Sequence, residues 1–389
     1  MTLVYWKEGE KMETIYLDHA ATTPMHPKVI DAMSDIMKDV FGNPSSIHGF
    51  GRQANVKLEE ARQIVADSLQ VSAHEIIFNS GGTEGDNTAL LETAFSRQEE
   101  GKHLITTAIE HPAVLNTMHY LESKGFEVTY LPVDEKGTLS IEDVKNALRE
   151  DTILVSVMYG NNEIGNLMPI KEIGELLRDH PAYFHTDAVQ AYGSQTIRPY
   201  ESNIDLLSVS GHKINGPKGV GFLFKRDGVK LPSMLIGGEQ EEKRRAGTEN
   251  LPGIWGMSQA VAILTEEERE QRKQKYLEYQ TAILERLDQA GIDYQVNGDL
   301  ENKLAHILNL RFPGAASDLL LMKLDLQGIA VSTGSACTAG NVEPSHVLEA
   351  MYGENTDAVK ESIRVSFGYG TTNEHVEQFT DKLISILKK

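Results

Sequence analysis

Short apolar runs alternate with longer segments in which apolar residues recur at helical spacing along most of this chain. Six runs have the length of a strand, at residues 75–79, 103–108, 152–158, 183–186, 205–210 and 219–224. Strands that alternate with helices favour a parallel sheet with helical crossover connections. The pattern therefore predicts an α/β protein built on a mostly parallel sheet.

The pattern changes near Thr265, where a charge-rich segment predicts a solvated helix that runs to Tyr276. Further along, we expect strands at 307–312 and 329–332 and a final helix at 375–387. This order predicts a large domain followed by a small one that closes with the final helix. We assign residues 27–268 to the large domain, residues 12–26 and 269–389 to the small domain, and residues 1–11 to an N-terminal extension.

The chain has 389 residues and a net charge of −20, from 37 basic and 57 acidic side chains. Such a charge disfavours non-specific binding of nucleic acid and of anionic membranes. No apolar run approaches the roughly 20 residues that cross a bilayer. The first 11 residues resemble neither a signal peptide nor a transit peptide. We therefore expect a cytoplasmic protein with no direct nucleic-acid or membrane partner.

Cys337 is the only cysteine, and it lies in a run of small residues from Ser332 to Gly340. A single cysteine excludes a disulfide within the chain and a cysteine-based zinc site, and it fits a reducing compartment. The 13 histidines show no metal-ligand spacing, so no resident metal is expected. A free cysteine is most often a small buried hydrophobic residue. The small neighbours of Cys337 favour an accessible loop instead, where the thiol is available for chemistry.

Five of the expected strands run into polar or glycine-rich turns. These turns contain Gly82 with Thr83, His111, Asn162, Asp187 and Lys213. Ligands of open α/β sheets bind outside the carboxyl ends of the strands. We therefore expect these turns to form one site at that edge of the sheet.

The turn at Gly82 and Thr83 precedes a helix that is expected to begin near Glu84. Free backbone N–H groups at a helix start bind anions, although a plain turn with Thr83 as the N-cap explains the residues equally well. Lys213 follows a strand, where burial lowers the pKa of a lysine and makes it a nucleophile and a base. The alternative for Lys213 is a surface side chain before a hairpin.

Asp187 ends an apolar strand, which predicts partial burial and a cationic partner for its carboxylate. The alternative is a turn in which the carboxylate accepts a hydrogen bond from its own backbone. Pyridoxal phosphate requires a lysine that binds it covalently, a carboxylate that keeps its ring nitrogen protonated, and a phosphate site. Asp187, Lys213 and the turn at Gly82 supply all three, so the combination favours pyridoxal phosphate as the cofactor.

His111 and Arg364 have two interpretations each. His111 precedes Pro112, so it could cap a helix or lay its imidazole over a cofactor ring. Arg364 lies in an alternating segment near the C-terminus, where its guanidinium could hold a substrate carboxylate or face solvent. The two residues by themselves leave both questions open.

Seven motifs, in one order from about Met12 to the C-terminus, closely resemble those of the NifS/IscS-type cysteine desulfurases. They are residues 16–24, 42–46, 80–87, 161–165, 210–213, 245–248 and 332–338. These enzymes have the aspartate-aminotransferase fold of pyridoxal-phosphate enzymes, also termed fold type I. The resemblance implies a large domain with a mostly parallel seven-stranded sheet and a smaller α+β domain.

The resemblance also implies how the cofactor would be held. Lys213 would bind it covalently, and Asp187 would pair with its ring nitrogen. Gln190 would contact the ring hydroxyl, and His111 would stack on the ring face as a catalytic residue. The phosphate would be held by Gly82, Thr83, Ser210 and His212.

Four further roles follow from the same resemblance. Thr248 would reach the phosphate bound to the neighbouring subunit, which implies a homodimer with shared sites. Asn162 and Arg364 would orient the substrate carboxylate, and Asn162 would also contact the cofactor. Cys337 would accept the sulfur, and it could ligate an iron–sulfur cluster transiently.

The implied reaction is the removal of sulfur from L-cysteine, which gives L-alanine and a persulfide on Cys337. The persulfide would pass to an acceptor protein, such as an iron–sulfur scaffold or a tRNA thiolase, or serve thio-cofactor synthesis. The alternatives are a selenocysteine lyase or an aminotransferase on the same fold, and a non-catalytic protein that docks a sulfur acceptor. Complete cofactor residues disfavour the last alternative, because a non-catalytic scaffold could lose Lys213 or Asp187.

Overall fold

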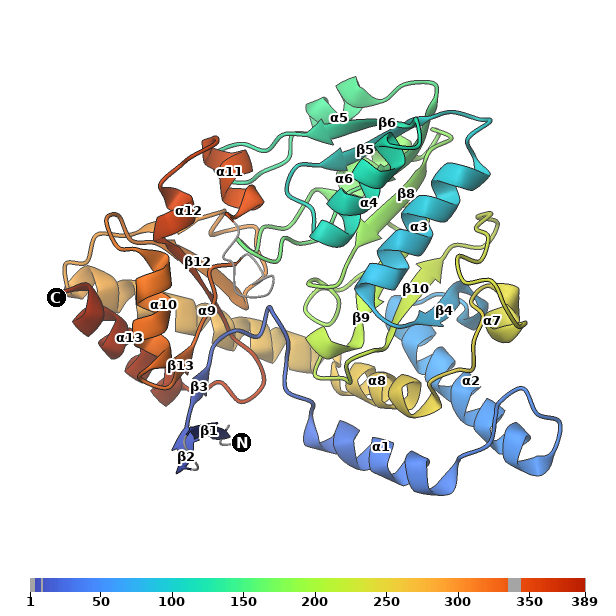
Figure 1. Cartoon of the computed structure of the whole chain (residues 1–389), viewed down its shortest axis with the longest axis horizontal. Coiled ribbons are helices and arrows are strands. Elements are labelled where there is room, and N and C mark those ends of the chain that lie inside the picture. The colour runs from blue at the N-terminus through green and yellow to red at the C-terminus, as the bar shows by residue number, and fades with distance from the viewer. Residues whose placement is uncertain (1–3, 8–9, 335–343, 389) are drawn as a thin grey trace.

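The computed structural model describes residues 4–7, 10–334 and 344–388 of the chain, with side chains from residue 14 onward. Figure 1 shows a larger body of helices around a sheet and a smaller body that contains the C-terminus. The expected α/β class is confirmed. The division of the chain near residue 268 remains a prediction.

The larger body contains a seven-stranded sheet in which six strands run parallel and β10 runs in the opposite direction. In spatial order the strands are β4 (Ile76–Asn79), β10 (Gly221–Lys225), β9 (Leu206–Ser210), β8 (Tyr183–Asp187), β7 (Thr152–Ser156), β5 (His103–Thr107) and β6 (Glu127–Leu131). The mostly parallel seven-stranded sheet is therefore confirmed. The six apolar runs did not include β6, because most of this edge strand is only partly buried and has no continuous apolar run.

Gly221 on β10 lies opposite both Asn79 and Ser210, the last residues of β4 and β9. These two strands therefore end at the same edge of the sheet, although the chain between them is long. A Cβ at Gly221 would lie 2.3 Å from the carbonyl oxygen of Val209 and 2.7 Å from Cα of Gly81. Glycine at this position lets the turn after β4 approach the end of β9.

Helices cover both faces of the sheet (Figure 1). On one face, Ile77 and Leu104 pack with α3 (Gly82–Ser96) and α4 (Pro112–Glu122). On the other face, Phe78 and Ile105 share a core with five further helices of this body. These helices are α1 (Pro27–Asp39), α2 (Gly49–Leu69), α5 (Ile141–Ala147), α6 (Ile170–Leu177) and α8 (Leu251–Ile263). Because neighbouring strand residues enter opposite cores, both must be apolar, which explains the unbroken apolar runs in the sequence.

The smaller body has a core of its own, which includes Phe312, Ile363 and Phe379. Its antiparallel sheet consists of β11 (Gln295–Asn297), β12 (Ile307–Arg311) and β14 (Ser362–Ser366). Helices α9 (Glu266–Gln289), α10 (Ser317–Asp325) and α13 (Asn373–Leu387) pack on this core. Between them in the chain lie α11 (His346–Tyr352), which buries Val347 and Leu348 in the core of the larger body, and α12 (Ala358–Glu361). Thr265 begins the charge-rich helix as predicted, because its Oγ1 accepts from the N–H of Glu268 (3.2 Å), but α9 extends well beyond Tyr276.

The N-terminal segment contains two short pairs of strands. The first pair, β1 (Val4–Lys7) and β2 (Glu10–Glu13), is antiparallel and continues past residue 11, where the N-terminal extension was expected to end. The next strand, β3 (Ile15–Tyr16), pairs parallel with β13 (Ile329–Ala330) of the smaller body. Within the described part of the chain, no helix has the length and apolar character needed to cross a membrane.

Candidate active site

The turn after β4 leaves backbone N–H groups free where α3 begins. The helix begins at Gly82 with Gly81 as its N-cap at φ 142°, so the interpretation of Thr83 as the N-cap is wrong. This backbone conformation favours glycine, which explains why the helix starts before the expected Glu84. No side chain of the described residues caps α3, so its first N–H groups can bind an anion. A Cβ at Gly82 would lie 2.7 Å from Cγ2 of Val189, so glycine also keeps this turn close to the end of β8.

Asp187 and Lys213 both lie inside the site. Asp187 is 6% exposed, and its Oδ1 accepts a hydrogen bond from the N–H of Val189 (2.8 Å). Its carboxylate is therefore buried and also forms a turn. Lys213 donates from Nζ to the carbonyl oxygens of Ala20 (2.5 Å) and Ala21 (2.9 Å), so its interpretation as a surface side chain is wrong. Burial lowers the pKa of Lys213 to about 8, which makes the neutral amine accessible near neutral pH.

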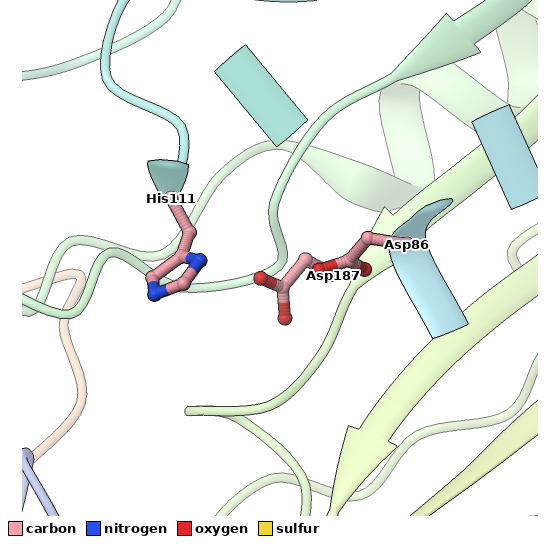
Figure 2. Close-up of side chains that lie close together, drawn as sticks. All are labelled: Asp86, His111 and Asp187. Carbon is pink, nitrogen blue, oxygen red and sulfur yellow. The ribbon is translucent and has the colours of Figure 1, made fainter. Parts of the chain in front are cut away.

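His111 caps a helix and also lies beside Asp187 (Figure 2). Its Nδ1 accepts a hydrogen bond from the N–H of Ala113 (3.1 Å), with Pro112 at the start of α4. A ring nitrogen of His111 lies within 4.8 Å of a carboxylate oxygen of Asp187. Burial lowers the pKa of His111, which favours a neutral imidazole. The capping role and a place in the site are therefore compatible.

Three other predicted cofactor residues lie at the same edge of the sheet. Gln190 donates from Nε2 to the carbonyl oxygen of Ala20 (2.9 Å), which also accepts from the candidate lysine. Ser210 is 5% exposed, and its Oγ lies 3.3 Å from the position of a Cβ at Gly81. His212 follows directly in a short 3-10 helix (Gly211–Lys213), and burial lowers its pKa to about 4.

A cavity of about 450 Å³ lies between the starts of α3 and α4. Thr83 and Asn87 line it from one helix, and His111, Asn116 and Tyr120 line it from the other side. Thr83 is exposed in this cavity. The cavity therefore connects the free N–H groups of α3 with the ring of His111.

Arg364 is 3% exposed, so its interpretation as a solvent-facing arginine is wrong. Its Nη2 donates to Oδ1 of Asp18 (2.8 Å), and its Nη1 donates to the carbonyl oxygen of Asn162 (2.8 Å). The structure thus brings the two predicted substrate residues together through the backbone of Asn162. Nε of Arg364 is buried without a hydrogen-bond partner among the described residues. Because an unpaired buried donor is costly, an anionic group bound here would recover free energy.

Thr248 is exposed, and no described hydrogen bond or ion pair joins it to the other predicted residues. It follows α7 (Gln240–Lys243), in which Glu241 and Glu242 have left-handed φ values of 48° and 57°. Arg62 on α2 holds this turn through two hydrogen bonds of 2.7 Å to the carboxylate of Glu241. Thr248 therefore lies at the surface, shortly after a turn that Arg62 fixes, where a second subunit could contact it.

Cys337 lies outside the described residues. The described residues on either side of it contact the site. The carbonyl oxygen of Gly334 accepts from Nη1 of Arg364 (3.3 Å), and Oγ of Ser345 donates to Oε2 of Glu163 (2.5 Å). The segment that carries Cys337 therefore begins and ends beside the candidate substrate residues.

Three buried polar residues of the site were not predicted: Asp86, Glu110 and His185. Asp86 lies on α3 beside Asp187 (Figure 2). Glu110 accepts hydrogen bonds from the N–H of Met158 at 2.9 and 3.0 Å, and burial raises its pKa to about 8. His185 lies two positions before Asp187 on β8, so both side chains are on one face of the strand. That spacing was the signal in the sequence that could have identified His185.

The described residues fit pyridoxal phosphate at three points. The uncapped start of α3, with no room for a Cβ at Gly82, suits a phosphate. The buried carboxylate of Asp187 suits a protonated ring nitrogen. The amine of Lys213, whose pKa is lowered to about 8, suits covalent binding of an aldehyde.

This chain is similar to known enzymes over nearly its whole length. The family model described as aminotransferase class-V matches residues 15–379. A relative from Bacillus subtilis (strain 168), provisionally named cysteine desulfurase IscS 1, is 54% identical over 378 residues, which are 97% of this chain and 100% of the relative. The cysteine desulfurase IscS of Dictyoglomus turgidum (strain DSM 6724 / Z-1310) is 44% identical over 96% of this chain and 95% of its own. A solved structure titled NifS-like protein has a TM-score of 0.90 and 35% identity, and the match covers 96% of this chain and 99% of that one. The chain therefore belongs to the class-V aminotransferases and, within them, to the cysteine desulfurase family.

Proposed function

We propose that this protein is a cysteine desulfurase that removes sulfur from L-cysteine, releases L-alanine and carries the sulfur as a persulfide on Cys337. The observation that carries the proposal is that Arg364 and Asp187 both lie close enough to Lys213 to shift the pKa of its amine. These three residues supply an amine, a carboxylate and a guanidinium, which are the groups that a cofactor-bound amino acid requires. The names of the similar proteins support L-cysteine as the substrate and disfavour a selenocysteine lyase or an aminotransferase.

Pyridoxal phosphate is the cofactor of this family. When bound, it withdraws electrons from the substrate, so that the Cα proton can be removed and the Cβ–Sγ bond can break. We propose that Lys213 binds it covalently, that Asp187 and Gln190 contact its ring, and that His111 lies against the ring face. The proposed phosphate contacts are Gly82, Thr83, Ser210 and His212, with Asn162 as a further cofactor contact.

Lys213 is proposed to move the proton at Cα. Its Nζ is held by the carbonyl oxygens of Ala20 and Ala21, and its pKa of about 8 lets the amine take and return a proton near neutral pH. General acid–base catalysis of this kind contributes about 10²–10⁴-fold. His111, whose pKa is lowered by burial, is a second candidate proton carrier beside Asp187.

Arg364 is proposed to bind the substrate carboxylate, and Cys337 to take the sulfur. Asp18 and the carbonyl oxygen of Asn162 orient the guanidinium, and Nε has no partner among the described residues. The S–S bond of the persulfide forms as the Cβ–Sγ bond breaks. The two thiol hydrogens supply the third hydrogen of the alanine methyl group and the S–H of the persulfide, so no external oxidant or reductant is consumed.

We further propose a homodimer in the reducing cytoplasm that passes its persulfide to an acceptor protein, such as an iron–sulfur scaffold or a tRNA thiolase. Exposed apolar residues support a subunit interface: Phe41 is 74%, Ile47 90% and Phe50 57% exposed near the connection between α1 and α2. Apolar surface of this kind marks protein–protein contacts. The exposed Thr248 supports the same arrangement, since its proposed ligand is the phosphate bound to the second subunit. Light scattering of the purified protein should therefore give twice the mass of one chain.

The experiment that tests the activity compares two single variants with the native protein on L-cysteine. Cys337→Ala should abolish catalytic sulfur release and persulfide formation while keeping the cofactor's colour. Lys213→Ala should lose both the bound cofactor's visible absorbance and alanine production. Native rates of alanine and sulfide production by Cys337→Ala would overturn the sulfur-acceptor role. A keto acid in place of alanine would identify an aminotransferase instead.

A further inference from the structure

Helix α3 places a second carboxyl group beside the proposed partner of the ring nitrogen. Asp86 is 1% exposed and Asp187 is 6% exposed. One oxygen of each carboxyl group and one nitrogen of His111 all lie within 4.8 Å of one another. Figure 2 shows the two carboxyl groups side by side, with the imidazole on the far side of Asp187. The mechanism proposed above does not use Asp86.

The described groups around Asp86 supply no positive charge to it. Nε2 of His185 lies 3.5 Å from Oδ1 of Asp86, but burial lowers the pKa of His185 to about 3, so its ring is neutral. His185 is held between the hydroxyl groups of Ser156 (2.8 Å) and Ser208 (3.1 Å). Oδ1 of Asp86 is buried without a hydrogen-bond partner in the described part of the chain. A charged carboxylate in this place would therefore be poorly compensated.

Two fully ionised carboxylates this close together in a buried site repel each other strongly. Burial raises the pKa of Asp86, the nearby carboxyl groups of Asp187 and Glu110 raise it further, and the hydroxyl of Ser208 opposes these effects. Burial raises the pKa of Asp187 too, but the N–H of Val189, which donates to its Oδ1, and the amine of Lys213 oppose this effect. Since more groups favour the ionised form of Asp187, the charge of the pair is more stable on that residue.

We propose that Asp86 is a positioning residue that carries the one proton shared by the pair, so that Asp187 alone offers a negative charge to the cofactor's ring nitrogen. The proton gives the unpartnered Oδ1 of Asp86 a hydrogen to donate, and it removes the repulsion between the two carboxyl groups. This inference rests on the proposed role of Asp187 as the partner of the ring nitrogen. It does not depend on which amino acid the enzyme uses.

Substitution of Asp86 by asparagine or leucine tests whether the residue acts as a neutral hydrogen-bonding group or as a charge. Asp86→Asn replaces a neutral acid by a neutral amide, so cofactor affinity should stay within about 3-fold and the pH midpoint of the bound cofactor's absorbance within about 0.3 units. Asp86→Leu removes the acceptor of the Ser208 hydroxyl and puts no polar group in its place, so the cofactor should bind at least about 10-fold more weakly. Equilibrium dialysis and a pH titration of the absorbance measure these changes in the holoenzyme.

Infrared difference spectra test the proton directly, without reference to activity. The native protein should show a protonated carboxyl band that is missing from Asp86→Asn. Glu110→Gln is the control, because Glu110 is buried, has a pKa raised to about 8 and should account for a separate band. If Asp86→Leu does not fold, the infrared spectrum and the pH midpoint of Asp86→Asn still decide the question.

Two results would overturn the proposal. The first is that Asp86→Asn removes no protonated carboxyl band from the infrared spectrum and shifts the pH midpoint of the bound cofactor's absorbance by about 1 unit or more. Such a shift is expected when a charged group is removed. The other is one equivalent of a divalent metal in the purified holoenzyme that is lost in Asp86→Asn, since a cation held by Asp86, His111 and Asp187 would keep both carboxyl groups ionised. Failure of the desulfurase assay alone leaves these measurements intact, so the two proposals can fail separately.

Discussion

The ion pair between Arg62 and Glu241 is expected to stabilise the turn of α7 by several kcal/mol, and Glu241→Gln tests this. The two side chains are 6% and 2% exposed, and two hydrogen bonds of 2.7 Å join them. Oε2 of Glu241 also accepts from the N–H of Phe78 on β4 (3.0 Å). The pair therefore connects α2, α7 and the sheet at one point.

Glutamine keeps the size of Glu241 but removes its charge, and its amide nitrogen would face a donor of Arg62. Removing one partner of a buried ion pair costs about 3–5 kcal/mol, because the remaining charge is uncompensated. Glutamine retains one acceptor oxygen, which places the expected loss in the free energy of unfolding at about 3 kcal/mol. The left-handed φ values of 48° at Glu241 and 57° at Glu242 make the turn unfavourable without such a contact.

Urea unfolding followed by circular dichroism, at one protein concentration, measures the loss. Glu242→Gln is the matched control, because the backbone of this neighbouring residue is also left-handed but its side chain is 75% exposed. The control should lose less than about 0.5 kcal/mol in the free energy of unfolding. In an Arg62→Met background, Glu241→Gln should cost at least about 2 kcal/mol less than in the native background. A loss below about 1 kcal/mol, or the same loss in both backgrounds, refutes the reasoning.

Three further predictions concern single residues. Lys303 is 6% exposed with no partner for Nζ among the described residues, and burial lowers its pKa from 10.5 to about 8. The folded state therefore binds this proton less well than the unfolded state, so Lys303→Met should raise stability by up to about 3 kcal/mol at pH 7, and the gain should shrink between pH 8 and 10.5 in urea titrations. Gly82→Ala should weaken cofactor binding by about 10-fold or more in equilibrium dialysis, because its Cβ would lie 2.7 Å from Cγ2 of Val189. Arg364→Lys should lower kcat/KM for L-cysteine about 10- to 150-fold in alanine assays, because charge-assisted hydrogen bonds worth about 1.5–3 kcal/mol are lost.

Each of these predictions has a result that contradicts it. A gain from Lys303→Met that does not change between pH 7 and pH 10.5 would mean that the charge of Lys303 is not the cause. Val189→Ala should restore part of the cofactor affinity lost in Gly82→Ala, and no recovery would exclude the steric explanation. A change of less than about 3-fold for Arg364→Lys would show that a single ammonium group suffices at that position.

The strand ends of the site were predictable because the central strands are buried on both faces. Such strands form unbroken apolar runs, and the turns after them bring His111, Asp187 and Lys213 to one edge. The start of α3 was placed too late, because Thr83 is a common N-cap residue while Gly81 caps through its backbone conformation alone. Local sequence preferences do not reveal which of two neighbouring residues takes a positive φ.

Contacts over long sequence distances were not predictable from local patterns. Asp18 holds Arg364 although 346 positions separate them, and nothing near either residue indicates the pairing. Asp86 lies in a helix segment with polar neighbours that is typical of an exposed face, and only packing against β9 shows that it is buried. The role proposed for Thr248 requires a second copy of the chain, so the sequence of one chain indicates it only through resemblance.

The antiparallel strand β10 has a consequence for how the protein is made. On the ribosome, the glycine turn after β4 emerges long before β9, and only β10, which comes later still, joins the two through Gly221. Arg364 follows near the end of the chain. A nascent polypeptide thus has no complete place for the vitamin B6 derivative until β10 has emerged, and none for the amino acid until translation is nearly finished, so loading cannot guide the folding of the earlier strands.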